Sequence, residues 1–109
     1  MIDETTMEDL VAALGAGSDE TREQAADSVT DLTRSYSPEQ ALRLVAALAE
    51  AAAVERSPSA REAQLHAASE LVEWHPGARA AAAAVASIDP ARVSASETEY
   101  LEYLTEAAG

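Results

Sequence analysis

Residues 57–71 read SPSAREAQLHAASEL, which is the start of an amphipathic helix opened by a serine. Residues 18–32 read SDETREQAADSVTDL, and a shift of 39 positions aligns Ser18 with Ser57 and Arg22 with Arg61. A weaker third copy, SETE, begins another 39 residues along, at position 96. A period near 40 in a helical chain is typical of stacked helix pairs, each burying its apolar face against the next. This repeat decides the predicted fold.

The composition favours helices over strands. About a quarter of the 109 residues are alanine and there is no phenylalanine; alanine has the highest helix propensity because it loses no side-chain entropy in a helix. The absence of cysteine excludes disulfides and thiolate chemistry. No apolar run approaches the roughly 20 residues that span a bilayer, and the acidic N-terminus differs from a basic secretory leader. We expect one cytoplasmic domain over residues 1–109, with no membrane segment.

The negative charge is large and uneven along the chain. The net charge is −13, with −8 in residues 1–31, −1 in residues 32–88 and −4 in residues 89–109. Such a charge repels nucleic acid and anionic lipid and attracts basic partners. The alternative is that the acidity only keeps an alanine-rich protein soluble.

Helix start and stop signals predict six helices in three antiparallel pairs. Capping boxes are expected at Thr5 and Glu8, at Ser37 and Gln40, and at Ser96 and Glu99. Serine N-caps at positions 18 and 57 open two more helices. The predicted helices span residues 6–14, 19–35, 38–55, 58–74, 78–88 and 97–107.

Each predicted helix has an apolar side that we expect to face the core. Leu42 and Ala49 should widen that side of the third helix. Tyr36 and Tyr100 are interpreted as core aromatics with solvated hydroxyls, and Tyr103 as an exposed anchor. The other expected core residues are Met7, Leu10, Val11, Leu14, Ala25, Val29, Leu32, Ala41, Leu44, Val45, Leu48, Ala52, Leu65, Ala68, Leu71, Val72, Ala81, Val85, Ile88, Leu101 and Leu104.

The segment 57–71 resembles the second helix of HEAT and armadillo-like repeats, in which a capping residue precedes an arginine and then alanine and leucine at helical spacing. Residues 18–32 fit the same template, whereas the third copy has Tyr100 where the arginine is expected. The resemblance implies a short right-handed solenoid. Short acidic helical-repeat proteins also resemble bacterial immunity proteins, and that likeness implies binding and neutralisation of a toxin through surface carboxylates.

The repeat register predicts a binding surface. The 39-residue shift aligns Glu23 with Glu62, Asp27 with His66, and Asp31 with Glu70. In a solenoid, equivalent positions of successive second helices lie side by side. Trp74 would lie at the end of one such column, and an aromatic beside carboxylates suits a basic protein partner. The alternative is that Trp74 packs against the last helix. The candidate partner-binding residues are Glu23, Asp27, Asp31, His66, Glu70, Trp74 and Tyr103.

Catalytic and cofactor signals are weak. The two histidines, His66 and His75, do not form a zinc motif, and the serines are explained as N-caps. His66 is interpreted as a surface residue that forms an i,i+4 contact with Glu70. A carboxylate metal site that combines Asp27, Asp31, Glu70 and His66 stays open as an alternative. We therefore expect no enzyme and no cofactor, but a monomer or weak homodimer that binds a basic protein, such as a toxin. The runners-up are a scaffolding adaptor and an acidic DNA mimic.

Overall fold

In the computed structural model, residues 1–108 are described, and this part of the chain is helical without any β-strand. The all-helical prediction is therefore confirmed for these residues; Gly109, the end of the predicted domain, lies outside them. The elements are α1 (Glu4–Leu14), α2 (Asp19–Asp31), η1 (Thr33–Ser35), α3 (Pro38–Val54), α4 (Pro58–Trp74), η2 (Pro76–Ser87), η3 (Pro90–Arg92) and α5 (Ala95–Ala108), where η denotes a 3-10 helix.

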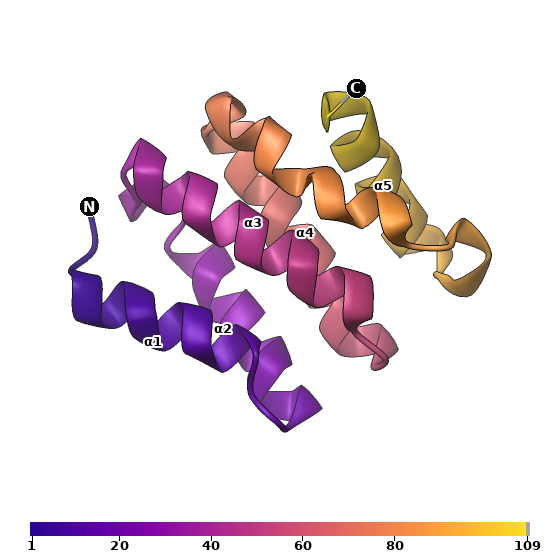
Figure 1. The fold of residues 1–109 in the computed structure, drawn as a ribbon, viewed down its shortest axis with the longest axis horizontal. Coiled ribbons are helices and arrows are strands. Elements are labelled where there is room, and N and C mark those ends of the chain that lie inside the picture. The colour runs from indigo at the N-terminus through magenta and orange to yellow at the C-terminus, as the bar shows by residue number, and fades with distance from the viewer. Residues whose placement is uncertain (109) are drawn as a thin grey trace.

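The helices form two layers. The layer nearer the viewer in Figure 1 contains α1, α3 and η2, and the layer behind it contains α2, α4 and α5. Within the layers, α3 packs against η2 and more sparsely against α1, while α4 packs against both α2 and α5. Helices that follow one another across a layer boundary also pack together, namely α1 with α2, α3 with α4, and η2 with α5. The molecule measures 38 × 31 × 18 Å.

The predicted serine caps at 18, 37 and 57 are all present. Ser18 accepts a hydrogen bond from the Thr21 amide, and Ser57 accepts one from the Ala60 amide. Ser37 forms the complete capping box with Gln40, in which the Gln40 amide donates to Ser37 Oγ and the Ser37 amide donates to Gln40 Oε1 at 3.0 Å. Pro38 and Pro58 occupy the first helical positions, where a missing N–H costs nothing.

The predicted caps of the first and last helices are wrong. Helix α1 begins at Glu4 because its N-cap is Asp3 and not Thr5. The Asp3 side chain accepts a hydrogen bond from the Thr6 amide at 2.8 Å. A box of Thr5 with Glu8 is thereby replaced by a cap two residues earlier. This cap and the surrounding backbone hydrogen bonds lower the pKa of the Asp3 carboxyl.

Helix α5 begins at Ala95, because the capping box uses Ser94 and Glu97 instead of Ser96 and Glu99. The Glu97 amide donates to Ser94 Oγ at 3.2 Å, and the Ser94 amide donates to Glu97 Oε2 at 2.9 Å. Both pairs have the same spacing in the sequence, so local chemistry does not separate them. Arg61 decides between them, because it binds the Glu97 carboxylate from α4.

Two predicted helices differ in form. Helix α2 stops at Asp31, and the Ser35 amide donates to the Leu32 carbonyl in a tight 3-10 turn instead of extending the helix to position 35. The alanine-rich segment predicted as an α-helix over 78–88 is the 12-residue 3-10 helix η2. A 3-10 helix rises about 2.0 Å per residue against about 1.5 Å for an α-helix. Twelve residues in this form thus run nearly the whole length of the 17-residue α3 against which they pack.

The core lies between the two layers and matches the predicted apolar sides closely. Nearly every predicted core residue of α3 and α4 is fully buried, but Leu42 is 48% exposed and does not widen the core. Tyr36 is buried, and its hydroxyl is not solvated as predicted, since it donates to the Val29 carbonyl at 3.0 Å. Leu10, Val11, Leu32, Ala81, Ile88 and Tyr100 lie at the edge of the core and are partly buried.

Candidate binding surfaces

The negative charge is concentrated in one layer. Helices α2, α4 and α5 together carry twelve carboxylates and two arginines, which is a formal charge of −10 out of the total of −13. Three of these charged groups serve the fold, because Arg61 pairs with Glu97 and Arg22 pairs with Glu55 of the α3–α4 loop. The other layer carries five carboxylates and two arginines, a charge of −3. Along the sequence the negative charge is merely uneven, whereas in the folded protein most of it lies in one of the two layers.

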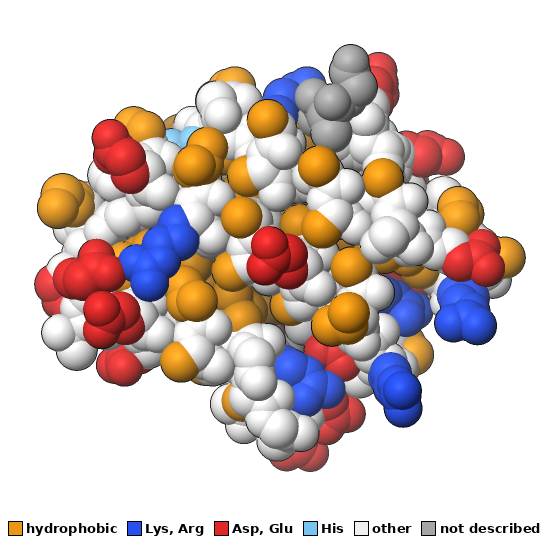
Figure 2. Space-filling model, viewed as in Figure 1, with side chains coloured by type: hydrophobic (Ala, Val, Ile, Leu, Met, Phe, Trp, Pro, Cys, Tyr) orange, Lys and Arg blue, Asp and Glu red, His pale blue; other side chains and the backbone are white. Residues whose placement is uncertain are grey.

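The face of the α1–α3–η2 layer carries fewer charged groups than the other layer. Figure 2 shows small hydrophobic side chains spread across its middle, with most acidic groups gathered at its edges. Val54 is 80% exposed and Leu42 48% exposed on this side of α3. The remaining exposed apolar residues of the layer are Ala12, Pro38, Pro76, Ala80, Ala83 and Ala86.

On α2, Asp27 and Asp31 are exposed and Glu23 is partly buried. Within residues 1–108, none of these three carboxylates forms a hydrogen bond or ion pair with another side chain. The pKa of Tyr36 is raised to about 12, mainly by burial of its hydroxyl and to a smaller extent by the negative charge of Asp31. Helix α2 packs against α4, as the predicted columns require. The alignment of Asp27 with His66 stays a prediction.

On α4, His66 and Glu70 are half-exposed and lie 3.5 Å apart (Nε2 to Oε1), which confirms the predicted i,i+4 contact. The His66 ring also lies 5.4 Å from the Tyr100 ring of α5. Tyr100 is thus partly buried at the edge of the core, beside the candidate residue His66. Burial raises the pKa of Tyr100, and the charges of Glu62, Glu99 and Glu70 add to this effect.

Trp74 lies at the end of α4 and is 49% exposed. It lines a hollow of about 490 Å³ together with residues of α3 and η2. The Arg34 guanidinium lies 4.2 Å from the centre of the indole ring, within the range of a cation–π contact. The other residues of the hollow are Pro38, Glu39, Leu42, His75, Pro76, Gly77 and Ala78.

Tyr103 is partly buried, and so is not the exposed anchor that we predicted. Its hydroxyl donates to Glu73 Oε2 at 3.0 Å, and Arg79 lies 5.5 Å from the centre of its ring. Burial and the hydrogen bond with Glu73 raise the pKa of Tyr103. Its ring therefore bridges α5, α4 and η2 instead of projecting freely.

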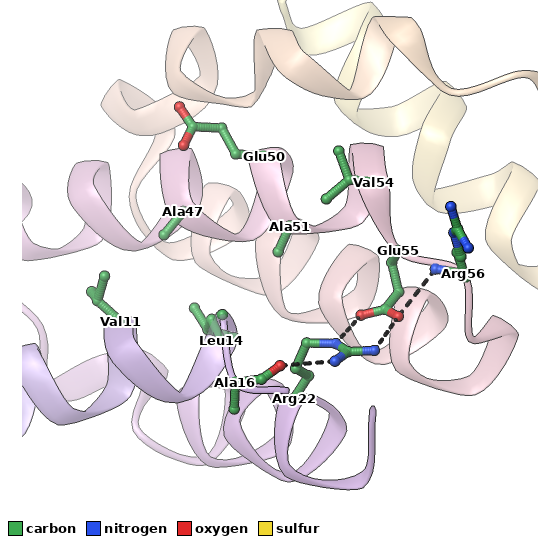
Figure 3. A pocket seen from close by; sticks show the side chains of 11 residues that line it. Val11, Leu14, Ala16, Arg22, Ala47, Glu50, Ala51, Val54, Glu55 and Arg56 are labelled. Atoms are coloured by element: carbon green, nitrogen blue, oxygen red, sulfur yellow. Dashed lines mark hydrogen bonds and ion pairs between the residues drawn. The ribbon is translucent and has the colours of Figure 1, made fainter. Parts of the chain in front are cut away.

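A second hollow, of about 570 Å³, lies between α1 and α3 on the face of the α1–α3–η2 layer (Figure 3). Val11 and Leu14 form one wall, and Ala47 and Ala51 form the other. The ion pair of Arg22 with Glu55, described next, closes one end. Sequence reasoning missed this hollow, because no local pattern reports how far apart two helices of one layer lie.

Arg22 and Glu55 form a buried ion pair between α2 and the α3–α4 loop. The Glu55 side chain is 2% exposed, and it also accepts hydrogen bonds from Gln64 Nε2 at 2.9 Å and from the amides of Arg56 and Ser57 at 3.1 Å. The bond from Arg22 outweighs the desolvation of the carboxylate and lowers the pKa of Glu55 to about 2. With all these donors, Glu55 serves the fold and is not free for a ligand.

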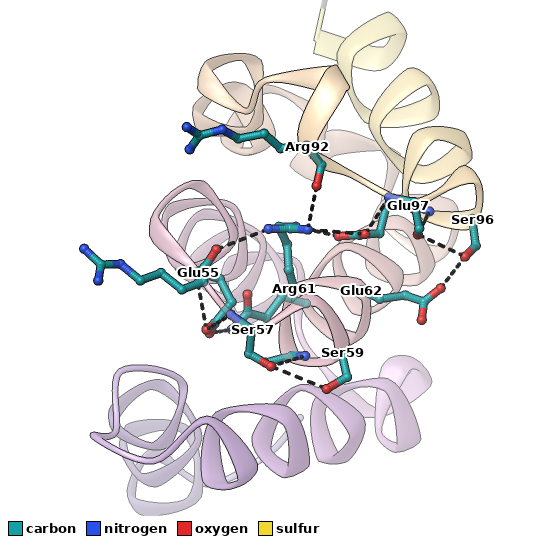
Figure 4. Close-up of polar contacts among 12 residues, drawn as sticks. Glu55, Ser57, Ser59, Arg61, Glu62, Arg92, Ser96 and Glu97 are labelled. Carbon is teal, nitrogen blue, oxygen red and sulfur yellow. Dashed lines mark hydrogen bonds and ion pairs between the residues drawn. The ribbon is translucent and has the colours of Figure 1, made fainter.

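An equivalent pair joins α4 to α5 (Figure 4). Arg61 Nε lies 2.5 Å from Glu97 Oε1, and Arg61 Nη2 donates to the Arg92 carbonyl at 3.2 Å. Burial alone would raise the pKa of Glu97, but the hydrogen bonds from Arg61 and Ser94 outweigh it and lower that pKa. The recurrence of arginine at positions 22 and 61 was the sequence signal for both pairs, although it did not identify their partners.

Residues 1–108 contain no group of three or more His, Asp or Glu side chains placed to hold a metal ion, so the four alternative metal ligands are not gathered. In the same described part, no helix has the length and apolarity required to cross a membrane. Comparisons of the chain with protein-family models, with curated proteins and with solved structures found no match.

Proposed function

We propose that this chain is a small acidic protein-binding module of the cytoplasm, without enzymatic activity, and most concretely an immunity protein that binds and neutralises a basic bacterial toxin. The observation that carries the proposal is the placement of −10 of the net charge in the α2–α4–α5 layer. Carboxylates gathered on one face steer a basic protein toward it and fix its orientation.

The finer architecture belongs to the same proposal. We propose that the three helix pairs stack as a right-handed HEAT-like solenoid, with α2, α4 and α5 as its second helices. The contacts of α4 with both α2 and α5 support this arrangement. Asp27 and Asp31 would then stand beside His66 and Glu70, and a partner would cover all four.

Trp74 supplies the apolar part of the proposed contact. Its half-exposed ring borders a hollow and lies on the same helix as Glu70. Aromatic anchors that become buried on binding carry much of the affinity of protein interfaces, while surrounding charges set orientation and association rate. A basic partner that places an apolar side chain in this hollow would use both features.

The test is a charge-reversed variant with a matched control. The partner is first captured on the immobilised protein from a lysate of its natural source. The variant D27R/D31R/E70R should then bind that partner at least about tenfold more weakly. The control E4R/E8R/D9R makes the same change in net charge on the other layer, away from the Trp74 hollow, and should retain binding. Equal losses in both variants, or unchanged affinity of the first, would contradict the proposal.

The same captured partner distinguishes the proposed function from two alternatives, a DNA mimic and a scaffolding adaptor. A DNA mimic would be displaced from its partner by duplex DNA, and its partner would itself bind DNA. A scaffolding adaptor would bind without changing the activity of the partner. Neutralisation predicts instead that the toxic activity of the partner falls in proportion to the complex formed.

A further inference from the structure

The exposed side of α3 carries an ordered series of charges at helical spacing. Glu39 and Arg43 lie in its first half, Glu50 lies in its second half, and Arg56 follows just after its last residue. All four side chains are exposed. Between the halves the same side bears only alanine, at positions 46 and 47, and both alanines are partly buried.

This series is complementary to itself when it is reversed. Read forward it is negative, positive, negative, positive, and read backward it is positive, negative, positive, negative. When two such helices lie antiparallel and cross at Ala46 and Ala47, Arg43 of each faces Glu50 of the other. Glu39 then falls near Arg56. A parallel arrangement would instead place like charges opposite each other, which costs free energy.

We propose that α3 joins two copies of this chain in an antiparallel dimer, with Arg43 and Glu50 paired across the two-fold axis. The charges needed for the contact are available. In the described residues, Glu39, Glu50 and the Arg56 guanidinium have no ion-pair partner. Arg43 donates through Nη1 to Glu4 at 2.7 Å, and its other nitrogens are free to bind a second carboxylate.

The surroundings of α3 suit a second copy better than the α2–α4–α5 layer does. Alanines at the crossing point allow two helix axes to approach to about 8 Å. Helix α3 lies in the middle of a broad face, on a molecule of 38 × 31 Å across that view, which is large enough for the roughly 800 Å² per partner of a standard interface. A dimer formed through the α2–α4–α5 layers would instead bring two surfaces together that each carry a formal charge of −10.

This dimer leaves the acidic layer of each copy exposed, because α2, α4 and α5 lie on the opposite side from the exposed side of α3. The inference does not rest on the proposed function, and it is tested with the purified protein alone. The dimer and the proposed function can therefore be refuted independently of each other.

Sedimentation velocity over a concentration series is the first measurement. The wild-type mass should rise from 11.4 kDa towards twice that value. R43E and E50R should each weaken dimerisation about tenfold or more, and the double variant R43E/E50R should restore it. A wild type that stays monomeric at every concentration, or a double variant no better than the single ones, would overturn the proposal. Circular dichroism of each variant checks that it is folded.

Cross-linking tests the antiparallel register itself. The chain has no cysteine, so A46C introduces the only thiol. Ala46 faces Ala47 of the second copy near the two-fold axis, so A46C should oxidise to a covalent dimer. S28C places a thiol at an exposed position of α2 and is the matched control. Cross-linking of S28C that is as fast as that of A46C would overturn the register.

Discussion

Arg22 and Glu55 lie 33 residues apart in the sequence and form two parallel hydrogen bonds, Nε to Oε1 at 2.7 Å and Nη2 to Oε2 at 2.9 Å. Arg61 repeats this arrangement with Glu97. Each arginine also donates to the carbonyl six residues before it, that of Ala16 for Arg22 and that of Glu55 for Arg61. In each case the arginine links the loop before its own helix to a glutamate of the next helix pair, and this shared role explains why the arginine recurs.

Replacement of Glu55 by glutamine should lower the free energy of unfolding by about 3 kcal/mol, because it leaves the partly buried Arg22 without its counter-charge. Chemical denaturation followed by circular dichroism would measure the change. The matched control is E4Q, which removes the exposed carboxylate paired with Arg43 and should cost less than about 1 kcal/mol. Equal effects of the two substitutions would show that burial of the first pair contributes nothing.

Acid should destabilise the protein through the same carboxylate. The pKa of Glu55 is lowered from 4.5 to about 2 in the folded state, so folding favours its charged form. Its contribution is fully present above pH 4.5 and is lost as the pH falls towards 2. The lowered pKa of Glu97 acts in the same direction. Thermal melts between these pH values should show a falling midpoint, and E55Q should show a shallower fall than the wild type.

The cap of α5 can be tested by two alanine substitutions two residues apart. S94A should cost about 1 kcal/mol, because it removes the hydroxyl that accepts from the Glu97 amide. Ser96 lies inside the helix, and its hydroxyl forms exposed hydrogen bonds with Glu62 and with Ser94 Oγ, so S96A should cost less than about 0.5 kcal/mol. The reverse order, measured by denaturant titration, would restore the cap first predicted from the sequence.

Trp74 should matter to binding more than to folding. W74A removes a half-exposed ring and should change the free energy of unfolding by about 1 kcal/mol or less. If the ring anchors the proposed partner, the same substitution should cost at least about 2 kcal/mol of binding free energy. Calorimetric titration with the captured partner measures the second value. The matched control is Y103A, since that ring is partly buried against Glu73 and Arg79 and should affect folding more.

Much of the fold could be predicted because its signals are local. The caps at Ser18, Ser37 and Ser57 depend on groups within three residues, and the buried faces of α3 and α4 depend on helical periodicity alone. Prediction failed where two local solutions were equivalent. The Ser94 and Ser96 boxes have the same chemistry, and only the distant Arg61 chooses between them.

The candidate site was predicted only in part. His66 and Glu70 form the expected contact because residues four apart meet on any helix. The positions of Trp74 and Tyr103 were not predictable in this way. The first depends on the ends of α3 and η2, and the second depends on side chains of α4 and η2.

The sequence by itself determined the number and order of the main helices, the caps at Ser18, Ser37 and Ser57, and most of the apolar sides, since each follows from the physics of a few adjacent residues. Only the tertiary structure decided the rest. It paired Arg22 with Glu55 and Arg61 with Glu97, stretched η2 into a 3-10 helix along α3, and placed most of the acidic charge in one layer. These features depend on which helices become neighbours, and the burial of the common core sets that choice.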